Sequence, residues 1–135
     1  MNIKELAIVL VIMGILDYIW LGVIQSDYIT EKIRDINRTS DIPHPPLTFV
    51  AVYLLMASAL WYFVLSKYKG DKKDTVVTAM FLGLVIYTTF DFSMLNLVAK
   101  WTMQDAIKDI LWGTAMFGIT AFIYTVIIDG MKKSS

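Results

Sequence analysis

The stretch that decides the fold runs from Ile3 to Gln25 and reads IKELAIVLVIMGILDYIWLGVIQ. Because a helix rises about 1.5 Å per residue, about 20 apolar residues carry it across the hydrocarbon core of a bilayer. The stretch is too long and too polar inside for a secretory signal peptide, and no small-residue cleavage site precedes its polar flank. We therefore expect it to persist as a membrane helix.

Three further apolar stretches follow, at about residues 47–68, 75–98 and 106–130. None shows the alternation of a barrel strand, and lipid cannot satisfy the free backbone groups of irregular chain, so each stretch is expected to be a helix. The segment between the last two is short, which makes them antiparallel neighbours. The sequence predicts one all-α transmembrane domain over residues 1–135, a polytopic four-helix bundle.

The composition of the 135-residue chain fits burial in lipid. Hydrophobic residues make up 57% of it, against about 45–50% apolar residues in soluble domains. The 12 Lys and Arg equal the 12 Asp and Glu, so membrane lipids are expected as partners and nucleic acid is not. With no Cys and one His, no metal site is predicted; His44, before the second span, is either solvated or within reach of acidic side chains.

The segment between the first two spans is longer than a tight connection. Ile29, Ile33 and Ile36 recur there at helical spacing among charged residues, which predicts a short interfacial helix. Its apolar stripe has two possible places, the lipid headgroup boundary or the mouth of the bundle, which it would then cap.

Lys and Arg are unevenly divided between the two ends of the expected bundle. Seven lie on the side that holds both chain ends and the loop after the second span, and five lie on the other side. Because cytoplasmic loops near span ends carry the excess of Lys and Arg, both termini are expected in the cytoplasm. The seven are Lys4, Lys67, Lys69, Lys72, Lys73, Lys132 and Lys133.

Three carboxylates fall inside the expected spans. A central Asp costs about 2.5–3.5 kcal/mol to insert, so Asp17, Asp91 and Asp109 need compensation. Each lies near the same end of its span, so adjacent helices would gather the three in one half of the bilayer, facing the bundle interior. They are the predicted centre of a ligand-binding site.

Aromatic residues accompany these acids at helical spacing. Trp20 follows Asp17 by three residues, Trp112 follows Asp109 by three, and Tyr87 precedes Asp91 by four. Their N–H and O–H groups are donors for a buried carboxylate, so the three belong to the predicted site, although an interfacial aromatic belt is the competing interpretation. For Tyr28 and Trp101, near helix ends, the belt is favoured.

Small residues recur at spacings of three and four in the last two spans. Ala79 and Gly83, together with Thr114, Gly118 and Ala121, predict close helix packing. Near the acids, Gly14, Gly22 and Gly113 have two interpretations: the missing side chain admits a ligand, or it lets two backbones touch. Most Ser and Thr of the spans are expected to bond to their own helix backbone.

Several motifs resemble a known family. The first span carries Leu16-Asp17-Tyr18-Ile19-Trp20-Leu21-Gly22, and later spans carry Tyr87-x-x-x-Asp91, Trp101 and Asp109-Ile110-Leu111-Trp112-Gly113-Thr114. Over nearly the whole chain they resemble the small membrane proteins called domain of unknown function 2177. Ser93-Met94 departs from the Thr-Asn frequent there, and Ala99 from a basic residue. The resemblance implies a four-helix membrane protein and marks Asp17, Trp20, Asp91, Asp109 and Trp112, without naming a reaction, substrate or cofactor.

Three functions are compatible with these residues. The leading hypothesis is a membrane-embedded module that binds or conducts a small cation, a proton or a lipid-like ligand through the buried acids. A second is an enzyme on an apolar substrate, with an Asp as acid or base, although no catalytic motif supports it. The third is a structural subunit, in which the acids fix helix register within a homo-oligomer or against a partner membrane protein.

Overall fold

The computed structural model describes residues 2–38 and 47–134, and every regular element in these ranges is helical. Helix α1 continues directly into a π-helical segment, η1, and a 3-10 turn, η2, follows α3. The bounds are α1 Ile3–Asp17, η1 Tyr18–Ile24, α2 Ser26–Asn37, α3 Leu47–Phe63, η2 Leu65–Lys67, α4 Lys72–Leu97 and α5 Met103–Ser134. The expectations for His44 and for the prolines before the second span lie outside the described residues.

Within the described residues, four helical stretches are long and apolar enough to cross a membrane. They are Ile3–Ile24, Leu47–Lys67, Lys72–Leu97 and Met103–Ser134, which confirms the predicted all-α, four-span fold. The last helix begins earlier than its apolar stretch because Thr102 and Asp105 form a capping box. The Thr102 N–H donates to the Asp105 carboxylate at 2.9 Å, and the Asp105 N–H donates to the Thr102 hydroxyl at 3.2 Å.

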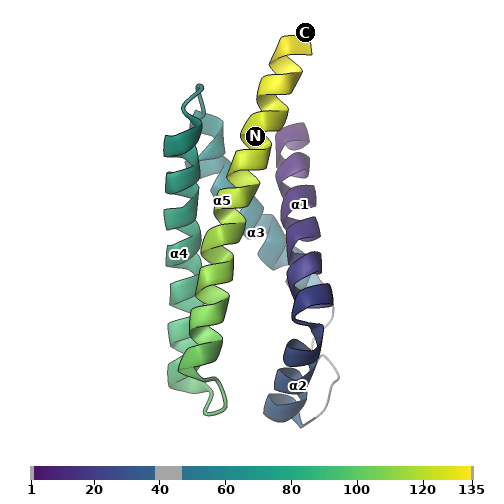
Figure 1. Ribbon diagram of the computed structural model, residues 1–135, viewed down its shortest axis with the longest axis vertical. Coiled ribbons are helices and arrows are strands. Elements are labelled where there is room, and N and C mark those ends of the chain that lie inside the picture. The colour runs from purple at the N-terminus through teal and green to yellow at the C-terminus, as the bar shows by residue number, and fades with distance from the viewer. Residues whose placement is uncertain (1, 39–46, 135) are drawn as a thin grey trace.

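The helices run alternately up and down, so the bundle has two distinct ends. Helices α4 and α5 lie side by side, α1 flanks α5 on its other side, and α3 passes behind (Figure 1). Residues near both termini lie at one end, here called the terminal end. Helix α2 and the connection between α4 and α5 lie at the opposite end, here called the α2 end.

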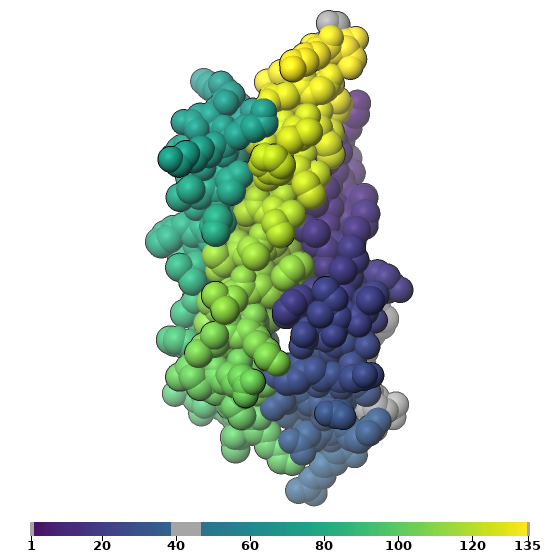
Figure 2. Space-filling view, viewed as in Figure 1, coloured from purple at the N-terminus to yellow at the C-terminus, as the bar shows by residue number. Residues whose placement is uncertain are grey.

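Close contact between α4 and α5 depends on glycine. A Cβ on Gly83 would lie 2.7 Å from the carbonyl oxygen of Gly113, and a Cβ on Gly118 would lie 2.6 Å from the Met80 side chain. Ala79 is fully buried in the same contact. The predicted small-residue packing is therefore confirmed, and the two helices form a continuous surface in the space-filling view (Figure 2).

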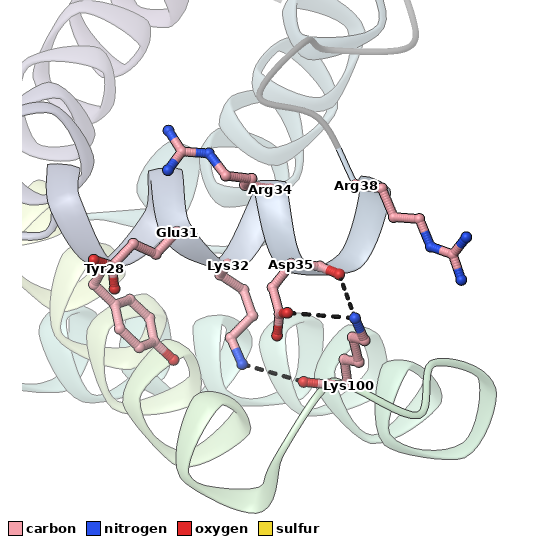
Figure 3. A pocket seen from close by; sticks show the side chains of 7 residues that line it. All are labelled: Tyr28, Glu31, Lys32, Arg34, Asp35, Arg38 and Lys100. Atoms are coloured by element: carbon pink, nitrogen blue, oxygen red, sulfur yellow. Dashed lines mark hydrogen bonds and ion pairs between the residues drawn. The ribbon is translucent and has the colours of Figure 1, made fainter.

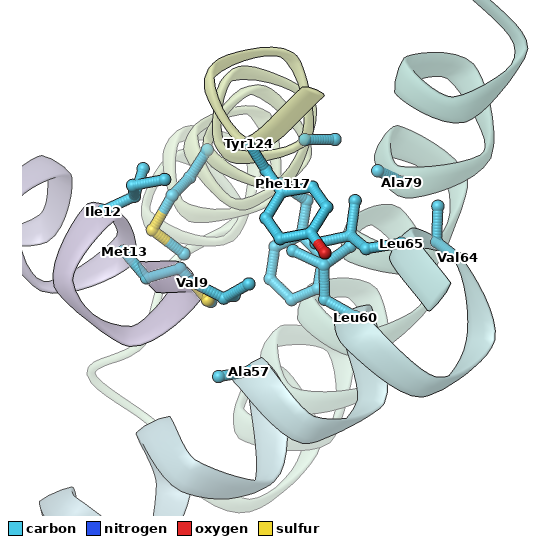
Figure 4. Packing of buried hydrophobic residues seen from close by; sticks show 12 residues of the cluster. Val9, Ile12, Met13, Ala57, Leu60, Val64, Leu65, Ala79, Phe117 and Tyr124 are labelled. Atoms are coloured by element: carbon cyan, nitrogen blue, oxygen red, sulfur yellow. The ribbon is translucent and has the colours of Figure 1, made fainter. Parts of the chain in front are cut away.

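The apolar core occupies the half of the bundle nearer the terminal end. Val9 and Met13 of α1, Leu60 of α3 and Phe117 of α5 are fully buried against one another in this cluster (Figure 4). Ala57 adds a small residue where α1 and α3 approach. Apolar side chains fill most of this half, and the buried carboxylates Asp17 and Asp91 lie in the other half.

A polar clamp closes the terminal end. The Tyr68 hydroxyl donates to the Asp129 carboxylate at 2.9 Å, and the Lys72 ammonium pairs with the same oxygen at 2.5 Å. Tyr68 belongs to the connection between α3 and α4, whereas Asp129 belongs to α5. The clamp therefore ties the third crossing to the last one.

Candidate functional site

The structure brings the three intramembrane carboxylates together in the half of the bundle near the α2 end. Asp17 ends α1, Asp91 lies in α4 and Asp109 lies in α5. Asp91 is fully buried, Asp17 is 6% exposed, and Asp109 is half-buried. Asp109 lies beside Asp91 and within electrostatic range of Asp17. The three form one group, here called the carboxylate cluster.

Asp17 takes its hydrogen-bond donors from other helices. The Tyr53 hydroxyl of α3 donates to one carboxylate oxygen, and the Trp112 indole N–H of α5 donates to the other at 2.7 Å. Trp20, expected as its partner, instead stacks on Trp112 with ring centroids 4.8 Å apart and planes 7° from parallel. Trp112 was expected to donate to Asp109. Its indole instead points across to α1 and donates to Asp17.

Asp91 has no such donors. In the described part of the chain, no group donates a hydrogen bond to either of its carboxylate oxygens, although Asp109 and Trp101 are polar neighbours. Tyr87, expected as its partner one turn earlier, packs its ring over Gly113 and edge-on against Phe117, with centroids 6.3 Å apart. Tyr87 thus supports the cluster by packing and donates nothing to Asp91. A fully buried carboxylate without a donor is costly, which makes Asp91 the unusual member of the group.

The three glycines near the acids have different roles: one allows close packing, and two leave space that a ligand could enter. A Cβ on Gly113 would lie 2.1 Å from the Tyr87 ring, so this glycine serves packing. A Cβ on Gly14 would meet no atom within 4 Å, and Gly14 and Gly22 line an open groove of about 400 Å³ with Asp17 and Tyr53. The groove leads from the outer face of α1 to the Asp17 carboxylate.

A second, much smaller cavity lies under α2. Its volume is about 30 Å³, and its lining includes Tyr28, Ile29, Trp101 and Asp109. The sequence favoured an interfacial belt for Tyr28 and Trp101, whereas the structure directs both rings to this cavity. The Lys108 ammonium lies 4.2 Å from the centre of the Tyr28 ring, a cation–π contact at its edge.

Helix α2 covers this end of the bundle through ion pairs. The Lys32 ammonium binds the Asp105 carboxylate at 2.7 Å and the carbonyl oxygen of Lys100 at 3.1 Å. The Lys100 ammonium returns to Asp35, 2.7 Å from its carbonyl oxygen and 3.3 Å from its carboxylate (Figure 3). These contacts hold α2 against the connection between α4 and α5, one of the two places considered for this helix.

Sequence reasoning missed two polar partners. Tyr53 was overlooked because it stands alone in an apolar span with no acid at helical spacing. Glu5 resembled an ordinary flanking charge, yet its carboxylate accepts the Trp61 indole N–H at 2.7 Å, with the buried Tyr124 as a further polar neighbour. In both cases the available signal was an aromatic donor, Tyr53 or Trp61, in the span that follows the acid's own span.

Three other polar side chains of α4 bond to their own helix backbone, as expected for its Ser and Thr residues. Thr89 and Ser93 donate to carbonyl oxygens one turn earlier at 2.7 Å, and Asn96 does so at 2.9 Å. Within residues 2–38 and 47–134, no three His, Cys, Asp or Glu side chains are placed to hold a metal ion. What the cluster offers chemically is therefore carboxylate oxygens beside aromatic donors: it can hold a proton or accept hydrogen bonds.

Comparison with known proteins supports the same architecture. Residues 2–126 match the family described as a predicted membrane protein, domain of unknown function 2177. No curated protein and no solved structure matches the chain. Because the family match covers almost the entire sequence, and the four membrane-length helices agree with its description, this multi-pass membrane protein belongs to the domain of unknown function 2177 family.

Proposed function

We propose that this protein binds a proton in its carboxylate cluster and releases it to one side of the membrane. The observation that carries the proposal is Asp91, a fully buried carboxyl group whose oxygens accept no hydrogen bond and which lies beside Asp109. Two adjacent carboxylates away from water are unfavourable when both are charged, so one proton shared between them is the simplest compensation.

The three acids differ in the hydrogen-bond donors that surround them. Asp17 has two donors, so its charge is compensated without a proton. Asp91 lacks that compensation within the described residues and lies beside Asp109, with which it interacts. Strongly interacting acids take up and release protons as a pair, which is the property that a relay or exchange site requires.

The same proposal includes the orientation of the chain. The terminal end carries seven Lys and Arg and the α2 end carries five, which favours a cytoplasmic terminal end. The carboxylate cluster would then lie in the outer half of the bilayer. Fusing a fluorescent protein and, separately, a periplasmic phosphatase to the C-terminus tests this: fluorescence with an inactive phosphatase is expected, and the reverse would contradict it.

The decisive experiment measures proton uptake in liposomes. Purified protein is reconstituted with a pH-sensitive dye inside, and a potassium gradient with valinomycin sets the membrane potential. Asp91→Asn is expected to lose uptake, whereas Asp74→Asn, at an exposed carboxylate of the terminal end, is expected to keep it. Uptake that Asp91→Asn leaves unchanged would refute the proposal, and uptake of Na⁺ or K⁺ in place of protons would reassign the ligand to a small cation.

A lipid-like ligand is the second candidate, and the groove at Gly14 is the observation that favours it. This groove is open on the outer face of α1 and ends at Asp17 and Tyr53, so a polar headgroup could bond there while its chain stays in lipid. Native mass spectrometry of gently extracted protein is expected to show a discrete adduct that Gly14→Leu removes and Ala7→Leu, at an exposed position of α1, retains. The same spectrum reports the oligomeric state, and an adduct-free protein would remove this candidate.

A further inference from the structure

The small cavity under α2 separates the carboxylate cluster from the aqueous α2 end. It is bounded by η1 and α2 on one side and by Trp101 and the first turns of α5 on the other. Its volume is about 30 Å³. A cavity needs about 10–15 Å³ to hold one water molecule, so the space is sufficient.

Two donors in its lining have no hydrogen-bond partner among residues 2–38 and 47–134. The Tyr28 hydroxyl and the Trp101 indole nitrogen are both buried and make no hydrogen bond. Such groups are rare in folded proteins, because each costs free energy unless a protein group or a water molecule satisfies it. Both side chains line the same cavity, so one occupant can satisfy both.

Acceptors lie within the same space. Asp109 contributes to the lining, and Trp101 is also a polar neighbour of Asp91. A buried water needs about two to four polar partners, and Tyr28, Trp101 and Asp109 supply three. The other charged groups of the lining are Asp105, which is paired with Lys32, and Lys108, which lies over the Tyr28 ring.

We infer that this cavity is a water-binding site in which Tyr28, Trp101 and Asp109 hold a water molecule that connects the carboxylate cluster with the α2 end. If the protein binds protons as proposed above, this water is the route by which they reach Asp109 and Asp91. The route passes under α2, whose Lys32–Asp105 pair keeps it covered.

The water site can be tested without any transport assay. In protein labelled with ¹⁵N-indole tryptophan, the Trp112 and Trp61 N–H groups donate to carboxylates at 2.7 Å and serve as protected references. The Trp101 N–H is expected to exchange with D₂O at least about tenfold faster than these, because no hydrogen bond to a carboxylate has to break first. Exchange as slow as that of Trp112 would overturn the inference.

A matched pair of variants separates cavity water from general exposure of this end. Ile29→Phe fills the cavity and is expected to slow Trp101 exchange towards that of Trp112. Ile24→Phe adds the same ring at a position that is 59% exposed and is expected to change nothing. Trp101 exchange that stays fast in Ile29→Phe, with Trp61 and Trp112 still protected, would also overturn the inference.

The proposed role of this water in proton transfer is tested separately, by proton uptake in liposomes. Tyr28→Phe removes one partner of the water and is expected to slow proton uptake in liposomes about fivefold, the factor that corresponds to one ordinary hydrogen bond. Tyr62→Phe, at an exposed site, is the control. If Asp91→Asn abolishes uptake while Tyr28→Phe and Ile29→Phe leave it unchanged, the route is wrong and the proposed function stands. If Asp91→Asn has no effect, the function fails, and the indole exchange alone decides the water site.

Discussion

Asp17 shows how a single carboxylate is accommodated inside an apolar bundle. Its two oxygens are bound by a hydroxyl from α3 and an indole from α5, so one residue of α1 joins three crossings. The stacking of Trp20 on Trp112 holds the indole in place from the α1 side. Charge and packing are therefore coupled at this residue, and removal of a donor affects the contact of three helices.

At this scale we predict the effect of Tyr53→Phe. The ring remains and the hydroxyl is lost, so Asp17 keeps only the Trp112 donor, and the free energy of unfolding is expected to fall by about 1–2 kcal/mol. Unfolding in mixed micelles, followed by circular dichroism, measures it. Tyr62→Phe, at an exposed ring, should unfold like the unmodified protein. Equal stability of the two variants would mean that the Tyr53 hydroxyl contributes nothing.

Helix pairs differ in how closely they approach, and the space around their glycines shows this difference. In α5, Gly113 faces the Tyr87 ring, whereas Gly14 in α1 faces open space. We predict that Gly113→Ala displaces Tyr87 and lowers the free energy of unfolding by about 1–3 kcal/mol, the usual range for overpacking. Gly14→Ala should be neutral or slightly stabilising, because alanine favours a helix and meets no neighbour. The reverse order of stability would contradict this account.

The docking of helix α2 on the bundle depends more on its partly buried ion pair than on its exposed one. In the Lys32–Asp105 pair the side chains are 17% and 4% exposed, and in the Lys100–Asp35 pair they are 52% and 63% exposed. We predict that Asp105→Asn, which keeps a capping side chain, speeds amide hydrogen exchange throughout α2. Asp35→Asn should have little effect, because exposed pairs contribute about 0–1 kcal/mol. Equal exchange in the two variants would argue against docking by Lys32.

How much the sequence could predict varied with the distance between interacting residues along the chain. The α4–α5 packing was predictable, because the two helices are neighbours in sequence and small residues show their contact face. The partners of Asp17 were not, since Tyr53 and Trp112 arrive from other helices and helical spacing points only to Trp20. The place of α2 remained open for the same reason: its ion pairs join residues 65 or more positions apart, such as Lys100 and Asp35.

For the molecule as a whole, the clamp at the terminal end gives stability a dependence on pH. Burial, and then the hydrogen bond to Asp129, raise the pKa of Tyr68 above its ordinary value of 10.0. A raised pKa means that the neutral phenol is the form that stabilises the fold. Its contribution is complete below pH 10 and is lost as the pH rises through the pKa in the folded state.

We therefore predict that the free energy of unfolding falls above pH 10 by more in the unmodified protein than in Tyr68→Phe. The difference between the two proteins isolates Tyr68 from the lysines, which titrate in the same range. Unfolding across an alkaline pH series, with tyrosinate absorbance as a second signal, measures it. Parallel curves for the two proteins would show that the clamp carries no such dependence.

The π-helical winding of η1 determines what the loss of one residue from this segment would do. Its turns close between residues five apart, as where the Gln25 N–H donates to the Trp20 carbonyl at 2.7 Å, so the segment accommodates more chain per turn than an α-helix does. A π-turn takes in one residue more than an α-turn, so deleting Val23, a residue with an exposed side chain, would let ordinary winding return and leave the chain beyond it near its present direction. A single-codon deletion in η1 should therefore keep α2 in place, whereas deleting Val11, an exposed residue of the α-helical part of the same span, would rotate everything that follows by about 100°.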